Sequence, residues 1–265
     1  MTFIKDAIRG LTSRPITQPI YLQLARLCDA GMNYGGGHSV VNSGEKEALL
    51  HLHKLFGGVR ALTLFDVGAN DGEYLEASLQ VFGNQVTAWS FEPQSTSFAR
   101  LSGRFGTDAR VNLRKIAVSS EPGSANLFFR FEGETTASLD REHIYRRTQP
   151  DQLQTETVKV STIDQICTQE GITGIDLLKI DTEGHEFDVL LGASSMLRAG
   201  AIYAVQFEFG ETFLGTRYHF KDLWDLLSPH YRFHRILRHG LAEIPRYSLD
   251  LEIYKISNFV CIRHC

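Results

Sequence analysis

Apolar runs rich in strand-forming residues alternate along most of the chain with stretches of helical apolar spacing. The pattern predicts strands over residues 61–67, 86–91, 111–118, 175–180 and 201–209, and helices over 72–82, 95–105, 162–170, 186–198 and 220–227. Residues 231–237 and 259–264 are two further predicted strands. Because strands that alternate with helices pair in parallel through right-handed crossovers, the sequence predicts an α/β fold. We expect a doubly wound, mostly parallel sheet with helices on both faces.

Two parts of the chain depart from this alternation. Residues 1–44 are predicted to be an N-terminal accessory segment, with a helix over 20–30 and a glycine-rich run after it. Ser43 precedes an apolar-periodic run to residue 56 and predicts an N-capped helix there. From about residue 123 to 160 a strand-like start turns polar, and long insertions of this kind typically form lids or substrate-binding elements. We therefore expect a main domain over 45–265 that carries this insertion.

Composition narrows the class of protein. The chain has 265 residues and is 43% hydrophobic, which is enough for a sizeable core. Its formal net charge of −4 argues against a nucleic acid as the main partner, because binding to phosphates needs a surplus of Lys and Arg. No segment approaches the roughly 20 apolar residues that cross a bilayer, and the four cysteines lack the spacing of a zinc site. We expect a cytoplasmic protein with no membrane span; a homo-oligomer is left open.

The most informative motif follows the first predicted strand, where Asp66, Gly68, Asn70 and Gly72 lie at alternate positions. In doubly wound sheets, ligands bind at loops on the carboxyl ends of strands, and glycine lets the backbone approach them closely. A dinucleotide fingerprint would have glycine where Asn70 stands, to make room for a pyrophosphate. The motif therefore favours a ligand with an amino-acid tail, although an ordinary strand-to-helix turn is the alternative.

The second strand ends in an acid, Glu92, which lies 26 residues after Asp66. An acid at this place can accept hydrogen bonds from the two ribose hydroxyls of an adenosine-containing cofactor. The alternative is a helix-capping or surface glutamate.

A cluster of titratable groups follows the strand over 175–180: Asp181, Glu183, His185 and Glu186. Groups this close shift one another's protonation equilibria, as acid–base sites require. For Glu186 we favour a structural role as an acid at the start of a helix. Lys179, inside the apolar strand, needs a buried acidic partner, and a structural ion pair explains it as well as a chemical role.

In order and spacing, these motifs resemble the FkbM family of methyltransferases. The resemblance runs over roughly residues 60–210, through the segments 65–72, 91–93, 160–164 and 178–186, and through 205–208, which resembles the family's acid-bearing fifth strand. It implies a class I, Rossmann-like sheet of seven strands with the last antiparallel. It also implies binding of S-adenosyl-L-methionine (SAM) and O-methylation of a hydroxyl on a sugar, glycoside or natural-product small molecule. Asp66, Gly68, Asn70 and Gly72 would hold the methionine part of SAM, Glu92 would hold the ribose, and Asp181 would lie near the sulfonium.

A hydroxyl acceptor must lose its proton during methyl transfer, and the candidates for this work are Asp181, Glu183, His185 and Glu208. In one hypothesis His185 or Asp181 is a general base. In the other, Asp181, Glu183 and Glu208 hold Mg²⁺, which acidifies the alcohol. The regions that choose the acceptor are expected in residues 1–44 and in the insertion, where Tyr145, Arg146 and Arg147 are further candidates.

Two other functions are consistent with parts of the sequence. A metal-dependent nucleotide-sugar glycosyltransferase would use an acidic pair such as Asp181 and Glu183 to bind the metal on a diphosphate, but it does not require the motif at Gly68. A non-catalytic SAM-binding module would keep the cofactor motifs without turnover.

Overall fold

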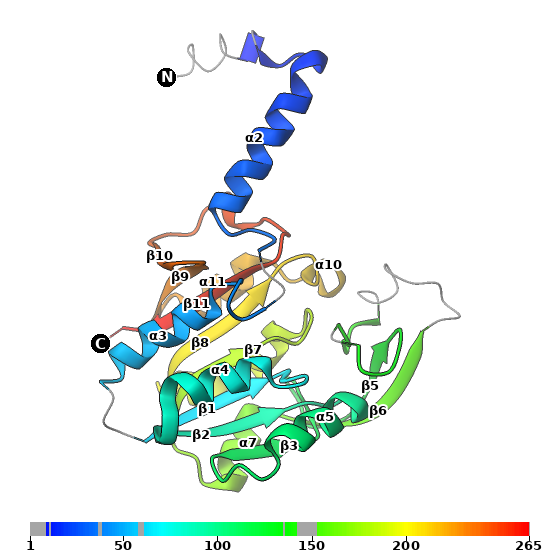
Figure 1. Cartoon of the computed structure of the whole chain (residues 1–265), viewed down its shortest axis with the longest axis vertical. Helices are drawn as coiled ribbons and strands as arrows, with labels where there is room; N and C mark the ends of the chain where they lie inside the picture. The colour runs from blue at the N-terminus through cyan, green and yellow to red at the C-terminus, as the bar shows by residue number, and fades with distance from the viewer. Residues whose placement is uncertain are drawn as a thin grey trace.

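The computed structural model describes residues 9–10, 12–36, 39–57, 61–134, 136–141 and 153–264, so that Tyr145, Arg146 and Arg147 lie outside the described residues. Eight strands form a large sheet in the order β10-β9-β11-β8-β7-β1-β2-β3. Their bounds are β1 (Leu62–Val67), β2 (Val86–Phe91), β3 (Val111–Arg114), β7 (Ile175–Ile180), β8 (Ile202–Phe209), β9 (Tyr231–Leu237), β10 (Gly240–Ile244) and β11 (Ser257–Arg263). Figure 1 shows the sheet running through the body of the molecule.

The sheet is mostly parallel, as predicted. Strands β3, β2, β1, β7 and β8 pair in parallel, whereas β11 is antiparallel to both β8 and β9. The predicted antiparallel last strand is therefore confirmed. The predicted number of seven strands is wrong for the large sheet, because β10 forms a hairpin with β9 and adds an eighth. Its sequence, Gly-Leu-Ala-Glu-Ile, has one β-branched residue and gives little strand signal.

Helices cover both faces of the sheet. One face carries α3 (Glu45–Leu55), α4 (Glu73–Phe82), followed by the short η2 (Gly83–Gln85), and α5 (Ser95–Phe105); the other carries α7 (Ile163–Glu170), α8 (Glu186–Leu191), α9 (Ser194–Arg198), α10 (Phe213–Thr216) and α11 (Phe220–Leu227). Side chains of β1 alternate between the two cores: Leu64 packs toward α3 and α4, and Phe65 and Val67 pack toward α7 and α8. Burial on both faces explains why the parallel strands are continuous apolar runs.

One predicted helix is split in two. The pattern over 186–198 becomes α8 and α9, which are separated at Gly192 and Ala193. A Cβ on Gly192 would overlap the backbone carbonyl oxygen of Ser119, so the chain passes too close to its neighbour there for any other residue. This close approach depends on the tertiary fold and leaves no sign in the local pattern.

The inserted region forms a small sheet of its own beside the large one (Figure 1). Strands β4 (Ala117–Val118), β5 (Gly123–Phe129) and β6 (Gln154–Ser161) pair in the order β4-β6-β5 and bury a small apolar core. The strand predicted over 111–118 is therefore divided: β3 belongs to the large sheet and β4 to the small one.

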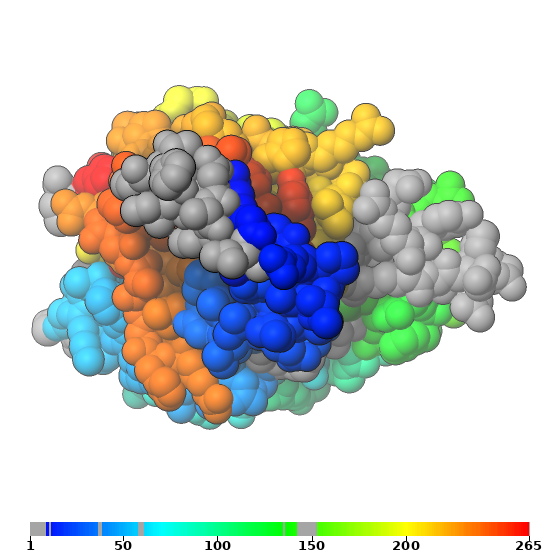
Figure 2. All heavy atoms as spheres, turned by 90° about the horizontal axis from the view of Figure 1, so that it is seen from above, coloured from blue at the N-terminus to red at the C-terminus, as the bar shows by residue number. Residues whose placement is uncertain are grey.

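At the N-terminus, η1 (Pro15–Thr17) leads into α2 (Gln18–Gly31), which projects from the body and has no buried residue (Figure 1). In the view from above, the blue atoms of α2 lie beside the orange atoms of β9 and β10 (Figure 2). The residues after α2 do pack on the domain: Gly35 N donates to Ile256 O at 2.7 Å, just beyond η4 (Leu249–Leu251), and Val40 is buried. The predicted boundary between residues 44 and 45 stays a prediction.

The prediction that Ser43 caps α3 is wrong. The residue before the helix is Gly44, at φ 88°, and no side chain caps the helix N-terminus. A Cβ on Gly44 would overlap the carbonyl of Leu237, which explains glycine at this position. The Ser43 hydroxyl instead donates to Oε2 of Glu45 at 2.9 Å. Within the described ranges, no helix has both the length and the apolar character needed to cross a bilayer.

Candidate active site

Two adjoining hollows lie at the carboxyl ends of the parallel strands. The first, here called the inner pocket, has a volume of about 560 Å³ and lies between the loops after β1, β2 and β7 and the small sheet. The second, here called the acidic cleft, has a volume of about 1420 Å³ and extends toward β8 and β11. Gly68, Asn70, Asp181 and Glu183 line both, so the two hollows meet at the loops that follow β1 and β7.

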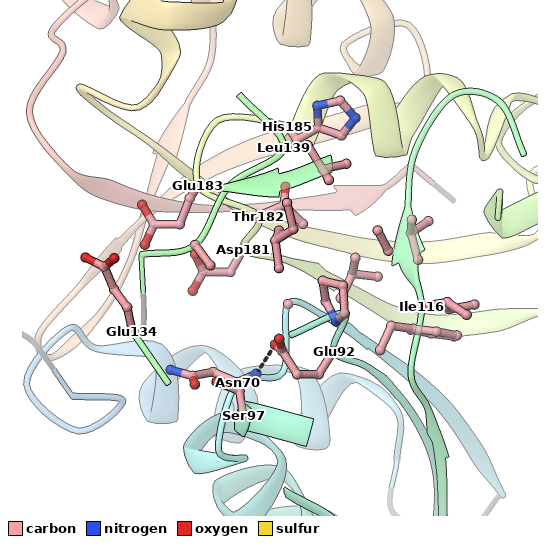
Figure 3. A pocket seen from close by; sticks show the side chains of 18 residues that line it. Asn70, Glu92, Ser97, Ile116, Glu134, Leu139, Asp181, Thr182, Glu183 and His185 are labelled. Atoms are coloured by element: carbon pink, nitrogen blue, oxygen red, sulfur yellow. Dashed lines mark hydrogen bonds between the residues drawn. The ribbon is translucent and has the colours of Figure 1, made fainter. Parts of the chain in front are cut away.

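The inner pocket has an apolar wall and a buried carboxylate. The apolar side chains include Phe91, Ile116, Val118, Leu127 and Leu139. Leu127 and Leu139 belong to the inserted region, which therefore forms part of the wall of this pocket. Figure 3 shows Glu92 and Asn70 on one side of the pocket and Asp181 and Glu183 on the other.

Glu92 is held in place by backbone amides. It follows β2 and is only 6% exposed. Asn70 N donates to its Oε2 at 2.9 Å and Gln94 N donates to its Oε1 at 2.8 Å. Burial raises the pKa of Glu92 to about 7 in spite of these two hydrogen bonds, because a carboxylate loses its hydration here. Each oxygen keeps a further lone pair that can accept from a ligand hydroxyl.

Only glycine fits at position 68, because the backbone of the loop after β7 lies too close for a side chain. Gly68 has φ 81°, and a Cβ there would overlap the carbonyl oxygen of Asp181. The loops after β1 and β7 therefore touch through their backbones at the junction of the two hollows. Gly72, at φ 88°, is the residue before α4 and a Cβ there would meet Leu101 and Phe105. Gly72 lines neither hollow, so its role is to let the backbone turn into α4.

Asn70 occupies the middle position of the motif with φ 48°, in the left-handed region that non-glycine residues seldom adopt. Its side-chain Oδ1 is buried and has no hydrogen-bond partner among the described residues. An unpaired buried oxygen is costly unless a ligand or water satisfies it. Asn70 therefore has a free acceptor at the boundary of the inner pocket and the acidic cleft.

A row of polar residues crosses the sheet on the face that carries α3 and α4. Asp66 of β1 pairs with Lys179 of β7, which in turn pairs with Gln206 of β8. Lys179 Nζ lies 3.0 Å from Asp181 Oδ2 and 3.9 Å from Asp66 Oδ1. Burial alone would lower the pKa of Lys179, but Asp181, Asp66 and Glu45 raise it above its usual value, so the ammonium stays charged.

Asp66 is fully buried and lines neither hollow. Burial raises its pKa to about 6, against the attraction of Lys179. The structure thus places Asp66 beneath the junction, where it contacts Lys179. A direct contact with the methionine part of a cofactor stays a prediction for this residue.

Glu45 extends this row from α3 and was not predicted. Gln206 Nε2 donates to Glu45 Oε1 at 2.9 Å, and Tyr74 OH donates to Gln206 Oε1 at 2.9 Å. The ammonium of Lys179 lies 5.0 Å from the centre of the Tyr74 ring. Burial raises the pKa of Glu45 to about 7, while Lys179 opposes the shift. In the sequence, an acid in the first turn of a helix indicates only a favourable interaction with the helix dipole.

The predicted carboxylates gather around the acidic cleft. Asp181 and Glu183 lie at the junction, and Glu208 lies further into the cleft near the end of β8. Burial raises the pKa of Glu208 well above its usual value, and Asp181 and Glu183 raise it further. Among the described residues, however, no three side chains of His, Cys, Asp or Glu come close enough together to hold a metal ion. The geometry of the donors therefore does not support Mg²⁺ at Asp181, Glu183 and Glu208.

His185 belongs to the inner pocket and does not line the acidic cleft. Its Nε2 lies 2.8 Å from Ser119 Oγ, and its Nδ1 lies 3.4 Å from Asp188 Oδ2. Burial lowers the pKa of His185, although Asp188 and Asp140 oppose the shift. Both ring nitrogens thus have protein neighbours, and a role of His185 as general base stays a prediction. Glu186 accepts from Thr182 N at 2.8 Å and from Gly184 N at 3.3 Å, which is the structural role favoured for it.

The chain is similar to known methyltransferases. The family described as Methyltransferase FkbM domain matches residues 66–235. A 2-O-methyltransferase, NoeI of Sinorhizobium fredii (strain NBRC 101917 / NGR234), is 28% identical over 145 residues, which cover 51% of this chain and 58% of that protein. The matched region thus spans little more than half the length of this curated relative.

Solved structures of methyltransferases resemble the chain more distantly. Methyltransferase FkbM from Methylobacillus flagellatus KT is 16% identical with a TM-score of 0.48, over 76% of this chain and 43% of that one. The plantazolicin methyltransferase BpumL, in complex with SAH, is 8% identical with a TM-score of 0.45, over 99% and 100% of the two chains. Both TM-scores are below 0.5, so the description of the fold rests on the sheet topology. Because the family match runs from the end of β1 into β9 and covers more than half of the sequence, the chain belongs to the FkbM methyltransferase family.

Proposed function

We propose that this protein is a SAM-dependent O-methyltransferase that acts on a hydroxyl of a sugar, glycoside or other small molecule. The observation that carries the proposal is the inner pocket. There, the buried carboxylate of Glu92 is held by the loop that follows β1, beside a space with an apolar wall. This combination suits an adenosine, whose base is flat and largely apolar and whose ribose has two hydroxyl donors.

The residues at the junction fit the other end of SAM. Its amino-acid tail has an ammonium and a carboxylate, and the junction offers both charges, in Asp181 and in Lys179. Asn70 adds a buried side-chain oxygen without a partner among the described residues. A pyrophosphate would find no glycine at position 70 and would meet carboxylates instead.

When bound, SAM supplies a methyl group on a positively charged sulfur. The chain itself must orient the acceptor oxygen and accept its proton. Asp181 and Glu183, which line both hollows, are placed to receive that proton, and Glu208 lies further along the same cleft. The acceptor enters the acidic cleft while Glu92 and the apolar wall orient the cofactor from the other side.

The family and the relative support this chemistry. NoeI is named as a 2-O-methyltransferase, and methylation of a hydroxyl is the corresponding reaction for this chain. We place the protein in the cytoplasm, because the four cysteines of the sequence indicate reduced thiols.

A ligand screen tests the proposal. Thermal unfolding is measured with SAM, S-adenosylhomocysteine, UDP and NAD, since a ligand that binds the folded state raises its stability by mass action. We expect stabilisation by SAM and S-adenosylhomocysteine alone. Stabilisation by UDP with a divalent cation would support a glycosyltransferase instead. Binding of SAM without transfer of its labelled methyl group to any of a set of hydroxylic acceptors would support a non-catalytic module.

A further inference from the structure

Carboxyl groups outnumber basic groups on the walls of the acidic cleft. The carboxylates that line it are Glu45, Asp71, Glu73, Asp181, Glu183, Glu208 and Glu211, and Lys179 is the one lining cation among the described residues. Concave surfaces lined by one sign of charge attract ligands of the opposite sign and repel ligands of the same sign. The cleft is therefore unfavourable for a phosphorylated or carboxylated acceptor.

An unpaired amide lies at the far end of the same cleft. Asn258 of β11 is 8% exposed and lines the cleft. It lies directly opposite Glu208 in the antiparallel pair of β11 and β8, so the two side chains are on the same face of the sheet. Gln206, two residues before Glu208, shares this face and contacts Glu45 of α3. The Asn258 carboxamide therefore points toward the cleft.

The carboxamide of Asn258 has no hydrogen-bond partner within the part of the chain that the structure describes. The amide atoms are not fully enclosed and reach the cleft, where an oxygen acceptor and N–H donors are free to bind a ligand. The cleft can accommodate a ligand that both accepts from and donates to this amide. Asn258 is thus a polar binding group beside Glu208 that does not depend on the acidic residues.

The surroundings of Glu208 favour a cation. Apart from burial, the groups that raise its pKa are the carboxylates of Asp181, Glu183, Glu186 and Glu45. A carboxylate among other carboxylates is stabilised by a bound positive charge, and the gain is large where water is scarce.

The cofactor alone does not account for this charge. The inner pocket and the junction lie at β1, β2 and β7, whereas Glu208 and Asn258 lie on β8 and β11, which are further along the sheet. The negative charge at β8 is therefore available to the acceptor.

We propose that the acceptor carries a protonated amine beside its hydroxyls, as an amino sugar does, and that Glu208 and Asn258 bind the amine-bearing end. The ammonium donates to the Glu208 carboxylate and to Oδ1 of Asn258, and Nδ2 of Asn258 donates to a neighbouring hydroxyl oxygen. This inference rests on the proposed function, because it assigns the acceptor of the same cleft.

Three sugars of one size separate the effect of charge from the effect of shape: glucosamine, glucose and glucuronate. Each is titrated into the protein saturated with S-adenosylhomocysteine at a pH where the amine is protonated. We expect glucosamine to bind at least about tenfold more tightly than glucose, the effect of one charge-assisted hydrogen bond, and glucuronate more weakly than glucose. Equal affinity for the three sugars, or binding of none of them, would overturn the inference.

Variants locate the preference. Glu208→Gln removes the charge with little change of shape and is expected to abolish the preference for glucosamine over glucose. Asn258→Leu removes the amide and is expected to weaken binding of both sugars. Asp225→Asn is the matched control, since Asp225 is exposed and pairs with Lys221 on α11 away from the cleft. A preference for glucosamine that persists in Glu208→Gln contradicts the assignment.

Affinity for S-adenosylhomocysteine is measured first for every variant. It reports whether the variant is folded, and its absence in the wild type contradicts the proposed function. Normal affinity for S-adenosylhomocysteine combined with indifference to the charge of the sugar contradicts only the cationic acceptor. The two failures are thus distinguishable.

Discussion

The backbone amide of Asn70 donates a hydrogen bond of 2.9 Å to Oε2 of Glu92. The two residues follow neighbouring parallel strands, β1 and β2, and this bond ties their loops together at the inner pocket. Because Gln94 N holds the other carboxylate oxygen, the orientation of Glu92 is fixed before any ligand binds. Binding then does not have to order this side chain, which favours affinity.

Replacement of Glu92 by Ala is expected to weaken binding of SAM by about 1–3 kcal/mol, the loss of hydrogen bonds to a charged group. Isothermal titration calorimetry measures the change. Glu92→Gln, which keeps the shape, is expected to lose less affinity than Glu92→Ala. Equal affinity of the wild type and Glu92→Ala would show that this carboxylate does not contact the cofactor.

The pH should change the affinity for the cofactor through the same residue. Burial raises the pKa of Glu92 to about 7, so below this pH the carboxyl is mostly protonated in the free protein. The ionised form accepts two hydroxyl donors better, so affinity for S-adenosylhomocysteine is expected to rise between about pH 6 and pH 8. In Glu92→Gln this rise should be smaller. An identical pH profile in both proteins would place the titrating group elsewhere.

Replacement of Gly68 by Ala tests the close approach of the loops after β1 and β7. A Cβ there overlaps the carbonyl oxygen of Asp181, and the backbone must move, so we expect a loss of at least roughly 3 kcal/mol in the free energy of unfolding. Gly171→Ala is the control, because Gly171 has a similar φ of 68° and no heavy atom within 4 Å of its Cβ. Its expected cost is about 1 kcal/mol. Denaturant titration measures both, and equal losses would refute the steric explanation.

Glu45 links stability to pH. Burial raises its pKa from 4.5 to about 7. Between these two pH values, Glu45 therefore holds a proton in the folded protein that the unfolded chain has already lost. The stability that the protein gains from this bound proton is present in full below the pKa of Glu45 in the unfolded chain. It is lost as the pH rises through the pKa of Glu45 in the folded protein. Glu45→Gln, which can still accept from Gln206, should therefore be more stable than the wild type by roughly 2–3 kcal/mol near pH 8 and equal to it near pH 4. Parallel stability curves for the two proteins would contradict this assignment.

The parts of the site that follow one strand directly were predictable from the sequence. Glu92, Asp181 and Glu183 come just after apolar runs, and the carboxyl ends of parallel strands meet at one edge of the sheet. The left-handed loop at Gly68 was likewise indicated by its glycine.

Residues that act through tertiary contacts were not predictable in this way. Glu45 reaches Gln206 only because α3 packs over β8, and Asn258 faces Glu208 only because β11 inserts between β8 and β9. In the sequence, Asn258 stands out only as a polar residue directly before the apolar residues Phe259 and Val260 of a strand. Ser43 misled the prediction because contact with Leu237, not hydrogen bonding, decides the start of α3.

A crystal structure with S-adenosylhomocysteine tests the central claim most directly. We predict that the adenine lies against Ile116 and Leu127, that both ribose hydroxyls lie within hydrogen-bond distance of Glu92, and that the amino-acid tail reaches Asn70 and Asp181. An inner pocket without the ligand in crystals soaked to saturation, or a ligand bound elsewhere on the chain, would contradict the assignment of this pocket as the cofactor site.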